Sequence, residues 1–141
     1  SFDSLSTLSE MLVIRYNPNL VSIGIPNLTT MNRYIDINNH DVLTDIDLSG
    51  LGSISNSCTL NNNYALSNID MSALSTIGQD LTITNNAMLD QLNDLYTITS
   101  IGRNVNISYN SSLPDAEIQS LISNIGTGNI GGVIVTNGNA P

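Results

Sequence analysis

The sequence predicts an all-β protein, a right-handed parallel β-solenoid of about five to six rungs of 23–24 residues each, with one C-terminal capping helix. Three observations lead to this fold class. Apolar residues recur in six fixed columns, the period of the recurrence is nearly constant, and residues suited to turns separate the apolar steps.

The repeat aligns on a short apolar–x–apolar step. The first residues of successive steps lie 23, 23, 23 and 24 residues apart, at Leu12, Ile35, Cys58, Leu81 and Val105. Five more columns lie 7 and 4 residues before this position and 2, 8 and 11 residues after it, and all 30 positions in five passes are apolar. The column at plus eleven holds Ile23, Ile46, Ile69, Leu92 and Ala116. The extra residue of the fourth pass falls between Leu92 and Ile98, because the columns match on both sides of that stretch.

The alternation within each step has the period of a β-strand, with side chains pointing inward and outward in turn. A second alternating step follows, as in Ile23-Gly24-Ile25 and Ile46-Asp47-Leu48. One pass cannot bury its apolar face alone, but passes stacked at about 4.8 Å form a continuous core. The repeat therefore predicts strands that pair with their equivalents in neighbouring passes.

Asparagine is the unusual residue, at 21 of 141 positions, and many of these form a ladder after each first strand. The column at plus five holds Asn17, His40, Asn63, Asn86 and Asn110, and the column at plus four holds Tyr16, Asn39, Asn62, Asn85 and Tyr109. Side-chain amides stacked in this way can bond to the next rung and to turn backbone that would otherwise be unpaired. We expect the ladder to be structural.

The chain divides into a solenoid of five rungs over residues 1–111 and a C-terminal cap over residues 112–141. Apolar residues at helical spacing predict a covering helix over about 115–125, opened by Pro114 and Asp115 and closed by Gly126. A last short strand is expected at about 133–136. The other end begins with Leu5 and Leu8 already in register, which predicts an uncapped first rung and a piece of a longer array.

The phrase Leu81-Thr82-Ile83-Thr84-Asn85-Asn86-Ala87-Met88-Leu89, which recurs every 23 residues or so, resembles the receptor L-domain-like branch of the leucine-rich repeats. The Asn stands five residues after the first strand Leu, as in ordinary leucine-rich repeats, but the next Leu follows that Asn by three residues rather than two. This resemblance implies a non-enzymatic module on the outside of a cell, of the bacterial or fungal cell-surface type. It carries over no site residues, because the shared motif is the core and the ladder.

Composition excludes several classes of partner. The chain has no lysine, and Arg15, Arg33 and Arg103 stand against twelve acids, for a net charge of −9. Nucleic-acid binding depends on clustered basic residues, so we expect no nucleic-acid partner. We also expect no membrane insertion, because no apolar stretch approaches about 20 residues.

Few residues offer chemistry. His40 lies in the asparagine column and Cys58 lies in an inward column, so we expect a corner residue and a small buried hydrophobe. Asp47 and Asp70 fall in one outward column on adjacent rungs, beside Asp45, and these three define a candidate Ca²⁺ site. The alternative is that these acids simply face water and keep the protein soluble. No other cofactor is expected.

The outward residues of the first strands form a flat, polar, almost uncharged face. We single out as candidates for partner binding Thr59, Asn61, Thr82, Thr84, Asn106 and Ser108. The alternative is a solvated face whose neutral side chains pair across rungs.

Three functions are compatible with these features. The first is an extracellular or cell-surface interaction and adhesion module, not an enzyme, that presents this face to a protein or glycan. The second is a structural subunit whose copies stack end to end into a surface fibre, through a heterologous contact that does not close. The third is a β-helix enzyme acting on polysaccharides, for which Asp45, Asp47 and Asp70 form the only dense carboxylate group.

Overall fold

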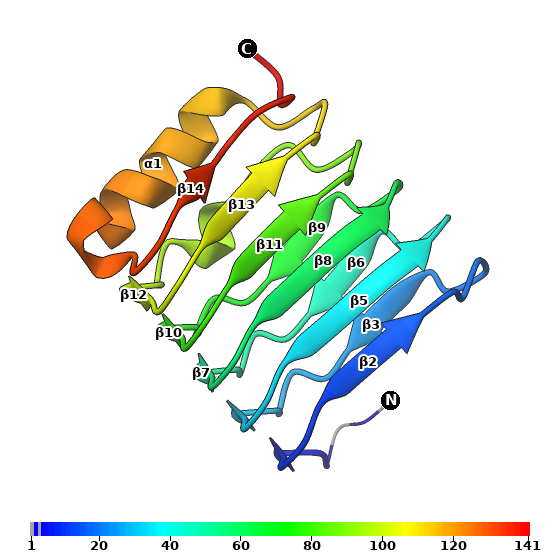
Figure 1. Cartoon of the computed structure of the whole chain (residues 1–141). Coiled ribbons are helices and arrows are strands. Elements are labelled where there is room, and N and C mark those ends of the chain that lie inside the picture. Colours follow the sequence, from blue (N-terminus) through cyan, green and yellow to red (C-terminus); the bar gives the residue numbers. More distant parts are fainter. Residues whose placement is uncertain (1, 3) are drawn as a thin grey trace.

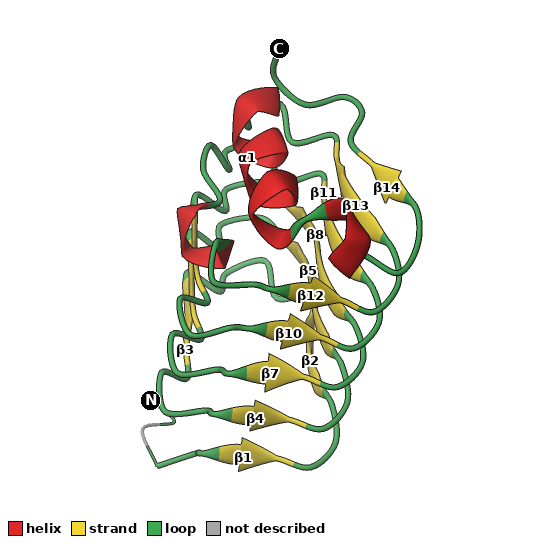
Figure 2. Cartoon of the chain, turned by 90° about the vertical axis from the view of Figure 1, so that its left-hand side faces the viewer, coloured by secondary structure: helices red, strands yellow, loops and turns green. Residues whose placement is uncertain are grey.

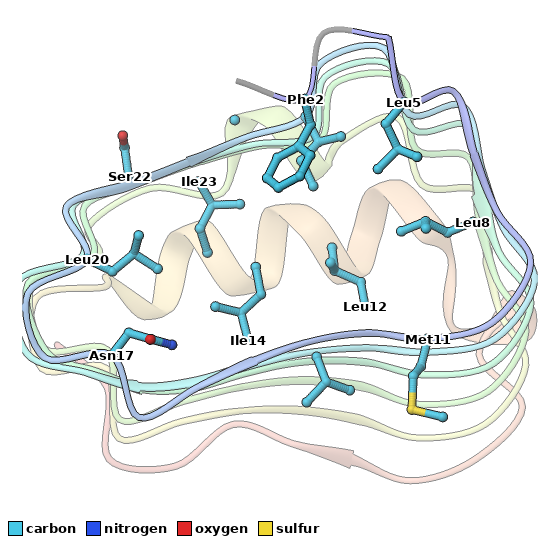
Figure 3. A pocket seen from close by; sticks show the side chains of 13 residues that line it. Phe2, Leu5, Leu8, Met11, Leu12, Ile14, Asn17, Leu20, Ser22 and Ile23 are labelled. Atoms are coloured by element: carbon cyan, nitrogen blue, oxygen red, sulfur yellow. The ribbon is translucent and has the colours of Figure 1, made fainter.

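The computed structural model describes residues 2 and 4–141, so that Ser1 and Asp3 of the expected solenoid domain lie outside the described residues. The fold is a parallel β-solenoid in which each turn contributes one strand to each of up to three sheets (Figure 1). Seen along the axis from the N-terminal end, the chain turns clockwise as it recedes, so the coil is right-handed (Figure 3). The predicted fold class is confirmed.

Sheet A is made of two-residue strands stacked one per turn (Figure 2). In spatial order these are β1 (Thr7–Leu8), β4 (Thr30–Met31), β7 (Ser53–Ile54), β10 (Thr76–Ile77) and β12 (Ser100–Ile101). Thr7, Thr30, Ser53, Thr76 and Ser100 are register partners in sequence, which marks about four complete turns. The rung count is therefore slightly lower than the five to six expected, because the chain leaves the coil after the fifth pass through sheet B.

Sheet B is the broad sheet. Its six strands, from the N-terminal end, are β2 (Leu12–Arg15), β5 (Ile35–His40), β8 (Cys58–Asn63), β11 (Leu81–Thr84), β13 (Val105–Ser108) and β14 (Ile134–Val135). The first residues of the five repeated steps are register partners, as the periodicity predicts.

Sheet C is short and holds only β3 (Ser22–Gly24), β6 (Asp45–Asp47) and β9 (Asn68–Asp70). In the fourth turn a 3₁₀ helix, η1 (Asn93–Leu95), replaces its strand. This helix lies between Leu92 and Ile98, and accommodates the one extra residue expected there.

The C-terminal end of the core is covered by helix α1 (Asp115–Ile125), which has the predicted bounds. Ile118, Leu121, Ile122 and Ile125 are buried on its inner side. A second 3₁₀ helix, η2 (Thr127–Asn129), leads into β14, which is shorter than the strand expected at 133–136. The assignment of Ala116 to the inward column is wrong: the chain has already entered α1 there, and Ala116 is exposed.

The asparagine ladder closes the corner after each sheet B strand. The amide Nδ2 of Asn86 donates to the carbonyl of Leu60 one turn earlier at 3.1 Å, and its Oδ1 accepts from the backbone N–H of Asn63 at 3.1 Å. Asn110 repeats the arrangement one turn later with Ile83 and Asn86. The corner itself needs a left-handed residue, and the plus-four column has φ between 53° and 60° throughout. Asn tolerates that conformation better than most residues, which explains its frequency here.

Candidate functional site

His40 and Cys58 are both completely buried and serve the core. His40 Nδ1 lies 3.2 Å from the backbone N–H of Asn17, and Nε2 lies 3.1 Å from the carbonyl oxygen of Ile14. Because the Asn17 N–H donates to Nδ1, the proton stands on Nε2, and the ring reproduces both bonds of a ladder asparagine. Burial raises the pKa of the Cys58 thiol to about 12, with a smaller contribution from the charge of Asp36, so the thiol stays protonated.

The three aspartates of the expected calcium site, Asp45, Asp47 and Asp70, are not gathered into one cluster in the described structure. Within residues 2 and 4–141 no three acidic, histidine or cysteine side chains gather closely enough to hold a metal ion. Oδ1 of Asp47 accepts the backbone N–H of Ser49, and Oδ1 of Asp70 accepts the backbone N–H of Ser72, each at 3.1 Å. The two acids stabilise local turns two residues downstream, which draws each carboxylate onto its own rung.

All three arginines pair with acids of a neighbouring turn. Arg15 contacts Asp36, Arg33 Nη1 lies 3.3 Å from Glu10, and Arg103 Nη1 lies 3.8 Å from Asp80. The contact with Asp36 raises the pKa of Arg15, chiefly through their hydrogen bond. Each positive charge is thus offset locally, and the described surface carries no cluster of cations.

The six predicted face residues stand on three adjacent sheet B strands but differ in accessibility. Thr59, Asn61, Thr82 and Asn106 are half-buried, whereas Thr84 and Ser108 are 9 % and 2 % exposed. Next to Ser108, the backbone N–H of Tyr109 donates to the carbonyl of Asn137, so the C-terminal segment runs alongside this end of β13. The accessible part of the face is therefore the half nearer the start of the strands.

A shallow groove of about 400 Å³ lies at that half and joins three predicted residues to residues that the sequence analysis did not select. It is lined by Ser57, Thr59, Asp80, Thr82, Asn104, Val105, Asn106, Val133 and Val135. No hydrogen bond within the described chain engages the hydroxyls of Thr59 and Thr82. Val133 and Val135 are 64 % and 41 % exposed and form an apolar floor beside these polar groups.

Asp80 is the charged residue of the groove, and hydrogen bonds hold it in place. Its Oδ1 accepts from the backbone N–H and from Nδ2 of Asn104, at 3.1 and 2.8 Å, while Asn104 Oδ1 accepts from the backbone N–H of Val133 at 2.9 Å. Partial burial by itself raises the pKa of Asp80, but the two bonds from Asn104, the charge of Arg103 and a bond from Ser57 outweigh it and lower the pKa. The carboxylate is thus charged at neutral pH and fixed in position.

Asp80 and Asn104 could have been found from the sequence. Both stand one residue before the aligned step, where the earlier turns carry Met11, Tyr34 and Ser57. The last three residues of that column, Ser57, Asp80 and Asn104, are polar, whereas the first two are Met11 and Tyr34. This change of character distinguishes the C-terminal turns at the corner between sheets A and B.

A larger cavity, about 770 Å³, opens at the N-terminal end of the coil. Its walls are apolar side chains of the first turn, among them Phe2, Leu8, Leu12, Ile14 and Ile23 (Figure 3). They occupy the columns that are buried in later turns, so the cavity is the first layer of the core as far as the described residues reach. It holds no constellation of polar groups that would serve chemistry.

Among the described residues, no helix has both the length and the hydrophobicity needed to span a membrane. Comparison with known proteins found no matching family model, no matching curated protein and no matching solved structure.

Proposed function

We propose that this chain is a non-enzymatic interaction module of an extracellular or cell-surface protein, and that it binds a protein or glycan partner through the sheet B groove. The observation that carries the proposal is the groove itself. Threonine hydroxyls, amide groups and a fixed carboxylate converge on an apolar floor, which is the mixture found in sites that recognise uncharged polar ligands.

The rigidity of the scaffold supports this role. The Asp80 carboxylate is held by two bonds from the next turn, and Thr59, Thr82 and Asn106 stand in one register across three paired strands. Groups held in this way lose little conformational entropy on binding. The location outside the cell rests on the resemblance to L domains and on the lysine-free, asparagine-rich composition.

The proposal is tested by screening the labelled protein on an array of glycans and purified extracellular protein domains, and then titrating each ligand by calorimetry. Thr82→Arg fills the groove and should weaken binding at least tenfold. Ser123→Arg places the same charge on the exposed side of α1 and should leave binding unchanged. A ligand that binds the parent protein and Thr82→Arg equally would refute a role for the groove.

End-to-end assembly is a second candidate, because within the described residues the apolar cavity and the outer edges of β1, β2 and β3 form a surface that a second copy could cover. A fibre needs a contact surface at both ends of the coil, and helix α1 covers the core at the C-terminal end. A contact between two N-terminal ends is therefore better supported than a repeating fibre. Sedimentation velocity over a range of concentrations distinguishes these states. Assembly through this end predicts a mass that rises with concentration in the parent protein and falls back to that of a monomer in Leu8→Ser. A parent protein that stays monomeric at the highest concentration would rule assembly out.

A further inference from the structure

Large apolar side chains are exposed along one corner of the coil, the corner that follows each sheet B strand. Five successive passes of the chain each supply one at this corner, four to seven residues after the first residue of the aligned step: Tyr16, Val42, Tyr64, Met88 and Tyr109, whose exposed fractions run from 42 % to 74 %. We call these five residues the corner ridge. Side chains so exposed contribute little to the core, and their recurrence at one corner of successive passes marks a candidate interaction surface.

Two of the tyrosines stand where the backbone disfavours them. Tyr16 and Tyr109 have φ of 55° and 59°, in the left-handed column that is otherwise filled by Asn39, Asn62 and Asn85. A bulky residue in this conformation is strained relative to asparagine, which tolerates it. The Tyr16 ring is 74 % exposed, so packing does not compensate that strain. A strained residue with an exposed ring points to recognition.

The three ridge tyrosines follow alternate strands of sheet B, so they recur at a regular interval along the coil axis. Arg15, Asn61 and Ser108 stand in one register column on the first, third and fifth strands of sheet B. Tyr16 and Tyr109 follow this column by one residue, whereas Tyr64 follows it by three and lies farther round the corner. Two turns of a parallel coil advance by about 10 Å. The tyrosines are thus about 10 Å apart along the axis, with Val42 and Met88 on the turns between them.

We propose that the corner ridge binds an extended, uncharged polysaccharide of β-1,4-linked hexoses. In such a chain every second sugar turns the same face outward, and that repeat is also about 10 Å, so successive tyrosine rings can stack on successive equivalent sugars. Stacking uses the apolar face of the sugar ring, and Val42 and Met88 extend the apolar contact between the tyrosines.

The negative charge beside the corner ridge disfavours binding of acidic polysaccharides. Asp41 precedes Val42, and Asp90 lies two residues after Met88, and both acids are exposed. Among the described residues no cation stands beside this corner except Arg15, which is paired with Asp36. A uronic-acid polymer would therefore be repelled, whereas a neutral glucan or an N-acetylated glucosamine polymer would not. The ridge lies at the opposite end of the sheet B strands from the groove, so the inference does not depend on the proposed function.

The experiment measures depletion of the protein from solution by insoluble cellulose, chitin and starch. Starch is the comparison polymer because its α-linked chain coils and does not present sugars in a straight row. We expect saturable binding to cellulose or chitin and none to starch. Tyr16→Asn restores the residue typical of its column, so it should fold at least as well as the parent protein while weakening binding about tenfold. Tyr64→Ala should have a similar effect.

The control is Tyr34→Ala, which removes a tyrosine from the opposite end of the sheet B strands, where its hydroxyl contacts Met11. It should bind like the parent protein once circular dichroism has shown that it is folded. Tyr109 is not used as a test because Asn137 donates to its hydroxyl and Gly138 lies against its ring, so that it also holds the C-terminal segment. Failure of the parent protein to bind either β-1,4-linked polymer would overturn the proposal, and so would variants Tyr16→Asn and Tyr64→Ala that bind as tightly as the parent protein. If the parent protein bound no polysaccharide but bound a protein partner, and the two variants lost that partner, the ridge would be a protein-binding surface and the proposal would also be wrong.

Discussion

Replacing one ladder asparagine tests whether these side chains hold the coil together. In Asn86→Ala the buried N–H of Asn63 loses its acceptor and the carbonyl of Leu60 loses a donor, both at 3.1 Å in the parent protein. An unpaired buried N–H costs about 1–3 kcal/mol and a lost hydrogen bond about 1 kcal/mol, so the free energy of unfolding should fall by about 3 kcal/mol. That is less than the total stability of a typical domain, so the variant should remain folded.

Asn17→Ala is the matched control, because Asn17 stands in the same column on the first turn. Its Nδ2 donates only to the carbonyl of Arg15 two residues away, and the site is exposed. We expect a loss below about 1 kcal/mol for this variant. Urea unfolding followed by circular dichroism measures both values. Equal losses in the two variants would contradict the reasoning, because buried and exposed members of the ladder would then contribute alike.

Three further outcomes are expected. An added Cβ at Gly78 would lie 2.0 Å from the backbone oxygen of Ser55, whereas none at Gly128 would lie within 4 Å of another group, so Gly78→Ala should lower the free energy of unfolding by about 2–3 kcal/mol and Gly128→Ala should change it little, as urea unfolding can show. The lowered pKa of Asp80 means that its carboxylate stabilises the fold above its unfolded-state pKa, and that this contribution disappears as the pH falls through the lower folded-state pKa. The difference in stability between the parent protein and Asp80→Asn should therefore shrink as the pH falls below about 3.9, the unfolded-state pKa of an aspartate. A difference that does not change with pH would contradict this reasoning. Cys58 should react with a thiol reagent only after urea unfolds the protein, since its pKa of about 12 and its burial both suppress the thiolate, and rapid labelling of the native protein would show otherwise.

Periodicity predicted the sheets because burial along a solenoid depends on one variable, the position of a residue within its turn. Once Leu12, Ile35 and Cys58 are aligned, the same backbone geometry applies to each, and the register follows. The prediction failed where the chain stops repeating. Ala116 is apolar and has the spacing of its column, but helix α1 begins at Asp115, so the backbone has already left the coil at Ala116.

The candidate site was harder to predict, because accessibility depends on segments that are distant in sequence. Thr82 and Thr84 alternate identically with their neighbours, yet Thr84 is buried and Thr82 lines the groove. The groove itself needs Val133, which reaches it only because β14 pairs with β13. For the aspartates the deciding contacts are local instead. The carboxylates of Asp47 and Asp70 accept hydrogen bonds from backbone N–H groups two residues downstream, so they are engaged within their own turns.

The plus-four column shows how a repeat can separate structural from functional residues without any comparison to relatives. Each turn imposes the same left-handed corner, so the residue that best satisfies it should recur, and Asn does so at Asn39, Asn62 and Asn85. A departure that improves packing is explained by the fold, as His40 is by its two ladder bonds in the neighbouring column. Tyr16 departs at a cost and gains no burial in return. Within a regular coil, a residue that is both strained and exposed is the one whose selection most needs a partner to explain it.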